Sequence, residues 1–404
     1  MFNTQPAAYP RYVPDYRVTI NGKQLPAPVR SSVLSVLYQD GVQEADRVEI
    51  KLANANLRWL QSHIRGLGFR PPTGVSFGPA HAPIVGPEGV FDPRGLFDLD
   101  NTLSLAMGYA SGPLSEMFLG DVTGLDVDFP NGGMPTMTLV AHDYMHRLSG
   151  GKIARGFSLL PDAIIAMILS AENLLLPVID PFVTGASAAI AAVNYFFKGT
   201  GTKQKGQTDF ELLKEIADKY DADFWVDGNT LYLSRFMKDY APAVSLKWGE
   251  SLLDFSPRIT TIGQVVGVAM KFSLREIPLD FVVTVGWDFD KESITVSVVP
   301  GASAVATPTL AGPIMTLIDQ PIASPVDMTN SALKIAHELR TKLNNRLTGS
   351  GTAIGDPRIR AGAVIRLEGL GPDFSGDYRI TNADHSIGGD GYRTHFKVRK
   401  EIIP

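Results

Sequence analysis

The feature that most constrains the fold of this chain is a strict alternation of residue types near its C-terminal end. Residues 392–399 follow the period of two that marks a half-buried β-strand. One face takes Tyr392, Thr394, Phe396 and Val398, and the opposite face takes Arg393, His395, Lys397 and Arg399. Residues 363–368 alternate in the same way, and a Gly-Gly-Asp-Gly turn at 388–391 accepts positive φ. Residues 351–400 are therefore predicted to form the edge of a small antiparallel barrel.

The first part of the chain carries further strand patterns. Residues 16–20 alternate ahead of an Asn-Gly pair, which is a strong hairpin signal, and residues 47–52 alternate again. Residues 125–129 lead into a Pro-Asn-Gly-Gly turn, from which residues 136–141 return. These patterns predict a β-meander with one buried face.

A compact helix–hairpin unit is predicted in the middle of the chain. Thr208 and Glu211 fit a capping box, in which the two residues satisfy each other's unpaired backbone N–H groups at a helix start. Helical spacing then places four side chains on one apolar face: Phe210, Leu213, Ala217 and Tyr220. Two short apolar runs flank a tight turn at residues 227–229, which predicts a hairpin directly after the helix.

A second helix is predicted over residues 329–348. Thr329 or Asn330 can cap its start, and Gly349 supplies its stop. Apolar residues recur along one side of the segment at helical spacing. This helix is expected to interrupt the strands of the last part of the chain.

Two segments follow neither a strand nor a helix pattern cleanly. Residues 66–95 are dense in Gly and Pro and predict a long surface loop, a feature that usually contacts another molecule. Residues 153–197 are strongly apolar but are broken by Pro, Asp and Glu. Their best unbroken run is shorter than the roughly 20 residues that a membrane-spanning helix needs. Packed helices or a subunit interface are favoured for 153–197, and contact with a membrane is the less favoured alternative.

Composition excludes several classes of function. The 404 residues include no cysteine, so disulfides and thiolate metal sites are excluded, which fits a cytosolic origin. A net charge of −5 argues against a nucleic-acid-binding protein, which needs a basic surface to neutralise phosphates. The N-terminal residues lack the basic and apolar regions of a signal peptide. A chain of this length is expected to form about two or three domains.

Two pairs of residues imitate parts of metal or catalytic sites. His142 and His146 are four apart, as two metal ligands on a helix would be, but no Glu follows His142 and no other ligands cluster nearby. Asp126 and Asp128 share one strand face, as a pair of glycosidase carboxylates does. Because acids on an exposed strand are common, we expect Asp126 and Asp128 to lie on a solvated face. We expect no metal site at His142 and His146.

The C-terminal strands carry the remaining candidates. Asp384 and His385 resemble a fragment of a Ser-His-Asp site, but no Ser lies in a G-x-S-x-G setting, so we expect His385 to form hydrogen bonds within the barrel. The basic residues Arg393, Lys397 and Arg399 are candidates for a subunit interface that meets an acidic surface, or for ordinary solvated surface. No catalytic residue, cofactor site or metal site is predicted.

Several linked elements at the C-terminal end resemble a known family. The run is IRAGAVIRLEGLGPDFSGDYRITNADHSIGGDGYRTHFKV, which combines a strand start, a Gly-rich turn, an Asp-His pair and a return strand. It closely resembles the end of the phage late control gene D family, the baseplate hub proteins of contractile phage tails and contractile injection systems. Blocks at about 117–148 and 205–300 resemble the same family. Asp143, Arg147 and Leu148 fill the places where its first domain typically ends.

The resemblance implies an α+β, mainly β chain. It implies two antiparallel barrel-like hub domains, at 1–148 and at 241–404 with the inserted helix. Between them, 149–240 is expected to hold the apolar helical segment and the helix–hairpin unit. Such a protein resembles the N-terminal part of valine-glycine-repeat tube-tip proteins, and since this chain stops soon after the second barrel, its spike is expected to be a separate protein.

The function implied by this resemblance is structural. Three copies would form a pseudo-sixfold ring that joins a hexameric inner tube protein to a trimeric spike, in contact with other baseplate components. The protein would be cytoplasmic during assembly and then part of a phage tail or injection particle. Two alternatives stay open: a tail-associated cell-wall hydrolase that uses Asp126 or Asp128, and a membrane- or receptor-contacting tail module that uses 153–197.

Overall fold

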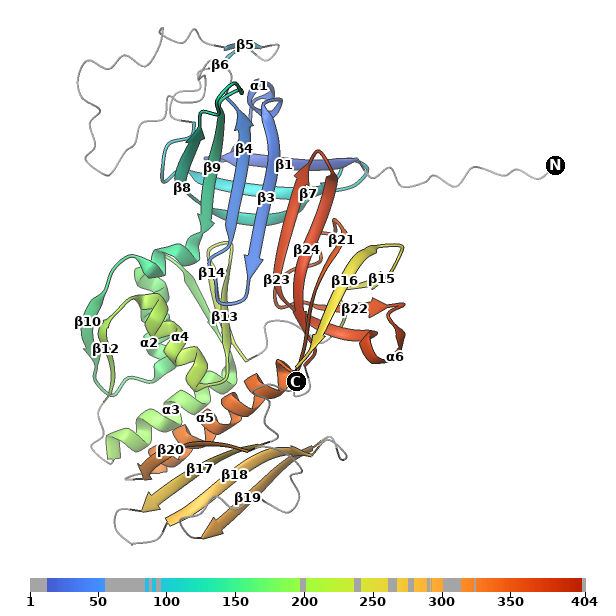
Figure 1. Ribbon diagram of the computed structural model, residues 1–404. Coiled ribbons are helices and arrows are strands. Elements are labelled where there is room, and N and C mark those ends of the chain that lie inside the picture. The colour runs from blue at the N-terminus through green and yellow to red at the C-terminus, as the bar shows by residue number, and fades with distance from the viewer. Residues whose placement is uncertain are drawn as a thin grey trace, which may run out of the picture.

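A computed structural model defines most of the chain. It describes residues 13–54, 84–86, 89–91, 96–196, 201–235, 241–260, 267–274, 280–288, 291, 293–300, 314–322 and 325–401. Strands dominate these residues, and helices accompany them mainly in the middle of the chain (Figure 1). The expected α+β, mainly β class is confirmed.

The first half of the chain forms a curved antiparallel sheet of six main strands. These are β1 (Pro14–Ile20), β3 (Val33–Gly41), β4 (Arg47–Ala53), β7 (Thr102–Tyr109), β8 (Ser115–Asp128) and β9 (Thr136–Asp143). Their order in space is β3-β4-β9-β8-β7-β1, and the short β2 (Lys23–Gln24) extends it beyond β1. The predicted meander is present, and its alternating apolar residues form one buried core. A single helical turn, α1 (Ala27–Arg30), leads into β3.

The end of the chain forms a second sheet of six strands. These are β15 (Val244–Lys247), β16 (Leu252–Ile259), β21 (Leu347–Ile354), β22 (Val364–Glu368), β23 (Gly376–Gly388) and β24 (Gly391–Arg399). The turn α6 (Gly371–Phe374) lies between β22 and β23. In β24, Tyr392, Thr394, Phe396 and Val398 are all buried, so the alternation predicted for this strand is confirmed.

The two sheets have the same topology. The second sheet runs β16-β21-β24-β23-β22-β15 in space, so in both sheets the strands lie in the order second, third, sixth, fifth, fourth, first along the chain. They differ at the last pair, where β1 is antiparallel to β7 but β15 is parallel to β22. Antiparallel pairing of β3 with β23 joins the two into one 13-stranded sheet (Figure 1).

A separate α/β unit lies between the two sheets in sequence. Its elements are the 3-10 helix η2 (Tyr144–Ser149), β10 (Ile153–Phe157), α2 (Asp162–Glu172), β11 (Leu176–Ile179), α3 (Pro181–Phe196), β12 (Thr202–Gln207), α4 (Asp209–Lys219), β13 (Asp223–Asp227) and β14 (Thr230–Ser234). The capping box and the β13–β14 hairpin are confirmed. The apolar segment 153–197 is helical only in part, because β10 pairs with β12 and β11 pairs with β14. Among the described residues, no helix is both long and apolar enough to cross a membrane.

A four-stranded sheet and a helix interrupt the second half of the chain. The strands β17 (Gly267–Leu274), β18 (Asp280–Asp288), β19 (Ser293–Pro300) and β20 (Ile314–Ile322) lie in the order β19-β18-β17-β20. Helix α5 (Pro325–Asn344) packs against them (Figure 1). Residues 267–300, which the resemblance placed in the second hub domain at 241–404, are not strands of its barrel, because in the described part of the chain β17, β18 and β19 pair only with one another and with β20.

Two predicted boundaries also need correction. Helix 329–348 begins earlier, because Pro325 occupies the first helical position, where a missing N–H costs nothing. Thr329 and Asn330 therefore lie inside the helix, and Gly349 lies in β21, opposite Pro257. Of the predicted loop 66–95, the described part is a ribbon of β5 (Ile84–Gly86) with β6 (Gly89–Phe91), and the rest lies outside the described residues.

The capping box of α4 yields a first prediction. The Thr208 hydroxyl accepts a hydrogen bond from Glu211 N at 3.1 Å, and Thr208 N donates to the Glu211 carboxylate at 2.9 Å. Substitution Thr208→Ala should lower the free energy of unfolding by about 1 kcal/mol, because one N–H of the first turn loses its acceptor. Equilibrium urea unfolding measures this change. Thr208→Ser keeps the acceptor and should stay close to wild type; equal stabilities of the two variants would contradict the prediction.

Candidate functional site

Charged side chains gather where the two six-stranded sheets meet. The buried carboxylates of Asp40, Asp46 and Asp143 lie there beside Tyr38 and the guanidinium of Arg360, and these five residues are called the acid cluster below. Asp40 is the next-to-last residue of β3, Asp46 precedes β4, and Asp143 ends β9, whereas Arg360 comes from the segment before β22. The acid cluster therefore combines groups from both sheets.

Hydrogen bonds bind the second sheet to the first through the acid cluster. Arg360 donates from Nε to the Asp40 carboxylate and from Nη2 to the Tyr38 hydroxyl at 2.6 Å. The backbone N–H of Ala361 donates to the same Asp40 oxygen at 3.0 Å. The Tyr38 hydroxyl in turn donates to Asp46 at 2.6 Å. One side chain of the second sheet thus holds two acidic residues of the first.

The acid cluster carries more negative than positive charge. Burial raises the pKa of Asp46 well above its usual value, and the nearby carboxylates of Asp40 and Asp143 raise it further. Burial likewise raises the pKa of Asp143, although Met145 N donates a hydrogen bond to its side chain. Arg360 opposes the rise at Asp46 from 3.9 Å. Protonation of Asp46 and of Asp143 therefore becomes easier on folding.

His385 lies next to the acid cluster, and its ring stacks on Tyr38 with the centroids 5.9 Å apart. Its Nε2 bonds the carbonyl oxygen of Ile359 at 2.8 Å, and since a carbonyl only accepts, Nε2 carries the proton. Nδ1 then accepts from the hydroxyls of Tyr392 at 2.9 Å and Thr394 at 3.1 Å. Burial lowers the pKa of His385 to about 4, so the ring is neutral. The expectation that His385 bonds within the barrel is confirmed.

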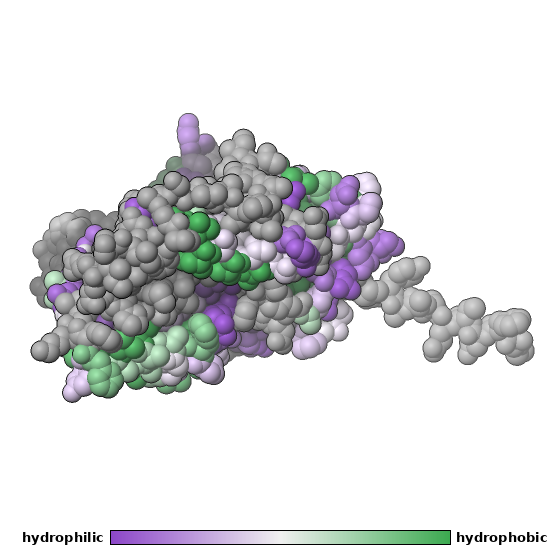
Figure 2. Space-filling model, turned by 90° about the horizontal axis from the view of Figure 1, so that it is seen from below, coloured by the Kyte–Doolittle hydropathy of each residue, from purple (hydrophilic) through white to green (hydrophobic). Residues whose placement is uncertain are grey.

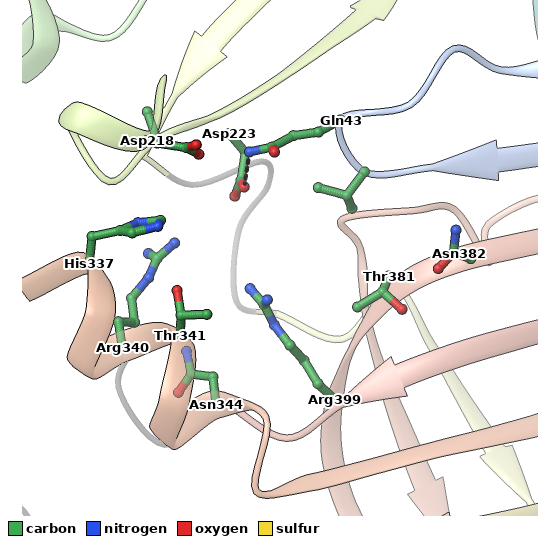
Figure 3. Close-up of a pocket in the computed structure, with 12 residues that line it drawn as sticks. Gln43, Asp218, Asp223, His337, Arg340, Thr341, Asn344, Thr381, Asn382 and Arg399 are labelled. Atoms are coloured by element: carbon green, nitrogen blue, oxygen red, sulfur yellow. Dashed lines mark hydrogen bonds between the residues drawn. The ribbon is translucent and has the colours of Figure 1, made fainter. Parts of the chain in front are cut away.

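A second polar site lies where the α/β unit, α5 and the second sheet meet. Figure 3 shows this pocket, of about 330 Å³, with polar side chains directed into it from several elements. Its lining residues are Val42, Gln43, Asp218, Ala222, Asp223, His337, Arg340, Thr341, Asn344, Thr381, Asn382 and Arg399. It is called the junction pocket below.

Charge pairs around the junction pocket connect α4 with α5. Asp221 accepts a hydrogen bond from His337 Nδ1 at 3.0 Å, and this bond raises the pKa of His337. Asp221 also pairs with Arg340 Nε at 3.2 Å. Burial raises the pKa of Asp223, which the guanidinium groups of Arg340 and Arg399 oppose. Gln43 donates to Asp223 at 3.3 Å from the turn after β3. The pocket therefore ties the α/β unit to both sheets.

The predicted interface residues do not act as one group. Arg393 and Lys397 are exposed on β24, whereas Arg399 lines the junction pocket and pairs with Glu401 at 2.9 Å. Their role at a subunit interface stays a prediction. Asp384 is only partly buried, and it lies next to His385 on a strand, so the two side chains point to opposite faces.

The two histidines proposed and discounted as metal ligands have different partners. His142 contacts the Thr123 hydroxyl at 2.6 Å, and His146 contacts the carbonyl of Asp143 at 2.5 Å, with the two rings 6.5 Å apart. Within the described residues, no group of three acidic or histidine side chains is placed to hold a metal ion. Asp126 and Asp128 are exposed at the end of β8.

The motif residues at the end of the first sheet have structural roles. The Asp143 side chain caps η2, and Arg147 donates twice to Asp121, at 2.7 and 3.1 Å. Leu148 is buried in the core of the α/β unit. No sequence pattern predicted the acid cluster, because Arg360 and Asp40 are 320 positions apart and neither lies in a distinctive local pattern.

Solved structures of phage tail proteins share this fold. The 43 kDa tail protein of prophage MuSo2 from Shewanella oneidensis is 13% identical, with a TM-score of 0.61 over 95% of this chain and 98% of that one. A tail protein from Neisseria meningitidis is 12% identical, with a TM-score of 0.58 over 96% and 97%. An E. coli component of the type VI secretion system, described as similar to T4 tail proteins gp27 and gp5, is 11% identical, with 0.51 over 96% and 80%.

These likenesses are structural, since no protein-family model and no curated protein matches the sequence. The shared fold extends over almost the whole chain, which includes the α/β unit and the four-stranded sheet. At this level of identity the likeness establishes the fold. The resemblance to tail proteins is thereby confirmed as a resemblance of fold.

The acid cluster yields a second prediction. Substitution Arg360→Met should lower the free energy of unfolding by about 3–5 kcal/mol, because it leaves the buried carboxylates without their cation. The control is Arg358→Met, which removes an exposed ion pair with Asp356 and should cost about 1 kcal/mol or less. Chemical denaturation compares both variants with wild type. Equal losses for the two would show that Arg360 does not neutralise the cluster.

The raised pKa of Asp46 yields a third prediction. An acid whose pKa is higher in the folded state binds its proton more tightly there, so stability falls as pH rises from about 4 through the folded pKa. Asp46→Asn removes this titration while its amide oxygen still accepts from Tyr38. The stability of the variant relative to wild type should increase as the pH rises above about 4, as measured by urea unfolding. A pH-independent difference between Asp46→Asn and wild type would refute this prediction.

Proposed function

We propose, on the premise that this chain shares the fold of phage and type VI tail proteins, that it is a structural baseplate hub. In this role three copies form a ring with pseudo-sixfold symmetry. The ring joins a hexameric inner tube to a trimeric spike, which resolves the mismatch between the two symmetries. The role is geometric and requires no catalysis from the chain.

The observation that carries this proposal is the internal duplication. Each chain contains two six-stranded sheets with the same strand order, joined edge to edge by β3 and β23. Three copies in a closed ring would present six similar sheets to a tube of six subunits. Closed rings are the usual outcome when one repeated head-to-tail contact returns to its start. Chain boundaries at about 148 and 241 divide the duplicated sheets from the α/β unit in this proposal.

Partners of the hub follow from the same proposal. They are a separate spike protein, the inner tube protein and other baseplate components, and the hub is made in the cytoplasm before it enters the particle. Exposed apolar side chains offer surfaces for such partners, and Phe182, Tyr195 and Phe196 of α3 are 39%, 69% and 78% exposed. Seen from below, the molecule carries hydrophobic patches beside hydrophilic ones (Figure 2).

The proposal predicts the mass of the protein in solution. Light scattering should give three times the monomer mass of 43.7 kDa, either for the protein alone or after its spike is added. A trimer formed only with the spike would mean that the spike nucleates the ring. A protein that stays monomeric at all concentrations and with every tail component would rule out the hub function.

A further inference from the structure

The contact that joins the two sheets within one chain has a defined register. Residues 36–41 of β3 pair with residues 382–387 of β23, and the strands are antiparallel. In this register Gln39 lies opposite Asp384, and Tyr38 lies opposite His385. Because the two sheets share one strand order, β3 corresponds to β16 and β23 corresponds to β8.

Local irregularities align β8 with β23 residue by residue. Each strand has a bulge at a threonine, Thr123 in β8 and Thr381 in β23. Both hydroxyls donate to a carbonyl of the next strand, Thr123 to Val140 and Thr381 to Lys397. Val140 lies opposite Gly124, the residue after Thr123. Lys397 lies opposite Asn382, the residue after Thr381. Asp126 of β8 therefore corresponds to Asp384 of β23.

The backbone before each bulge matches as well. Val122 exchanges backbone hydrogen bonds with the segment that leads into β7, through Asn101 O and Asp100 N. Ile380 does the same with the segment that leads into β22, through Ala363 O and Gly362 N. The pairing of β7 with β8 and the pairing of β22 with β23 therefore end at equivalent points in the two sheets. The residues that follow each bulge thus present the same edge.

Strands β3 and β16 align in the same way. Each has a bulge at an exposed leucine, Leu34 in β3 and Leu253 in β16. Before the bulge, the carbonyl of Ser32 accepts from Ala53 N at 2.7 Å, and the carbonyl of Ser251 accepts from Ile354 N at 3.0 Å. Counting from the bulges, Arg258 of β16 corresponds to Gln39 of β3.

Only one of the two equivalent junctions is made within the chain. β23 pairs with β3 beyond its bulge, whereas β8 beyond Thr123 pairs only with β9 in the described part of the chain. Apart from an isolated bridge between Leu252 and Trp248, β16 likewise pairs only with β21 there, so its outer edge is open from Leu253 onward. The strands β8 and β16 lie on opposite sides of the molecule (Figure 1). One copy can therefore offer β8 to a neighbour while it offers β16 to another.

We propose that β16 of one copy pairs antiparallel with residues 124–129 of β8 in the next copy. The occupant of this edge is thus a second copy of the same chain, and the inference rests on the ring of the proposed function. The register of the internal junction, transferred by the two bulges, places Asp126 opposite Arg258, Leu125 opposite Ile259, and Val127 opposite Pro257.

The transferred register brings complementary side chains together. Asp126 and Arg258 are both exposed and have opposite charges, and directly opposed pairs of this kind stabilise antiparallel strands. Leu125 is partly buried and Ile259 is 55% exposed, so their contact would remove apolar surface from water. Pro257 has no N–H, so the ladder at this junction has one donor fewer than a full one.

The absence of cysteine makes a specific cross-link the first test. The double variant Asp126→Cys/Arg258→Cys, oxidised as the assembled protein, should form covalent dimers and trimers on a non-reducing gel. Opposed residues of antiparallel strands lie within the Cα separation that a disulfide spans. The matched control is Gln39→Cys/Asp384→Cys at the internal junction, which should close within one chain and run as a monomer. A register control, Asp126→Cys/Asp254→Cys, should stay uncrosslinked.

Charge reversal tests the same pair without a disulfide. Asp126→Arg alone should reduce the trimeric fraction in light scattering, because it places two cations opposite each other. The double variant Asp126→Arg/Arg258→Asp should restore the trimeric fraction. Both residues are exposed, so folding is not at stake.

The outcomes separate this inference from the hub function. A wild-type trimer in which the internal control closes, but Asp126→Cys/Arg258→Cys does not cross-link, would overturn the β8–β16 junction and leave the hub function standing. A wild-type protein that stays monomeric with its spike would overturn the hub function and this junction with it.

Discussion

The pairing of β3 with β23 is the contact on which the rest of this structure depends. It turns two sheets from opposite halves of the chain into one 13-stranded sheet. The same contact places Arg360 against Asp40, so that backbone hydrogen bonds and a partly buried ion pair act at one junction. A ladder of backbone bonds sets the distance and register between the sheets, and the ion pair adds a charged contact between the two.

The two polar sites have different mechanical consequences. The acid cluster lies inside the junction of the two sheets, where an uneven charge balance is tolerated because Arg360 and the Tyr38 hydroxyl contact the carboxylates directly. The junction pocket lies further out, where Asp221 links α4 to α5 through His337 and Arg340. Polar contacts thus help to hold the α/β unit to the duplicated sheets, and Leu119 of the first sheet and Ala45 of its β3–β4 turn also pack against the apolar core of the α/β unit.

Local elements of the fold were predictable from the sequence. The alternation at 392–399, the capping box at Thr208 and the hairpin that follows α4 depend on residues close together in the chain, and all three are present. The start of α5 was predicted too late. The polar residues at 329–330 suggested a cap there, whereas the helix begins at Pro325. The separate sheet of β17 to β20 was missed because a strand pattern does not specify which strand it pairs with.

The sequence by itself determined many of the strands and helices, among them the strand at 392–399 and the helix that Thr208 caps, and also the resemblance to tail hub proteins. The tertiary structure alone decided that two sheets share one strand order, and that Arg360 reaches Asp40 from 320 positions away. The periodicity of apolar residues indicates which face of a segment is buried and which faces water, and this is a local property. The choice of a neighbouring strand or a buried charge partner depends on the packing of distant segments, for which no local pattern exists.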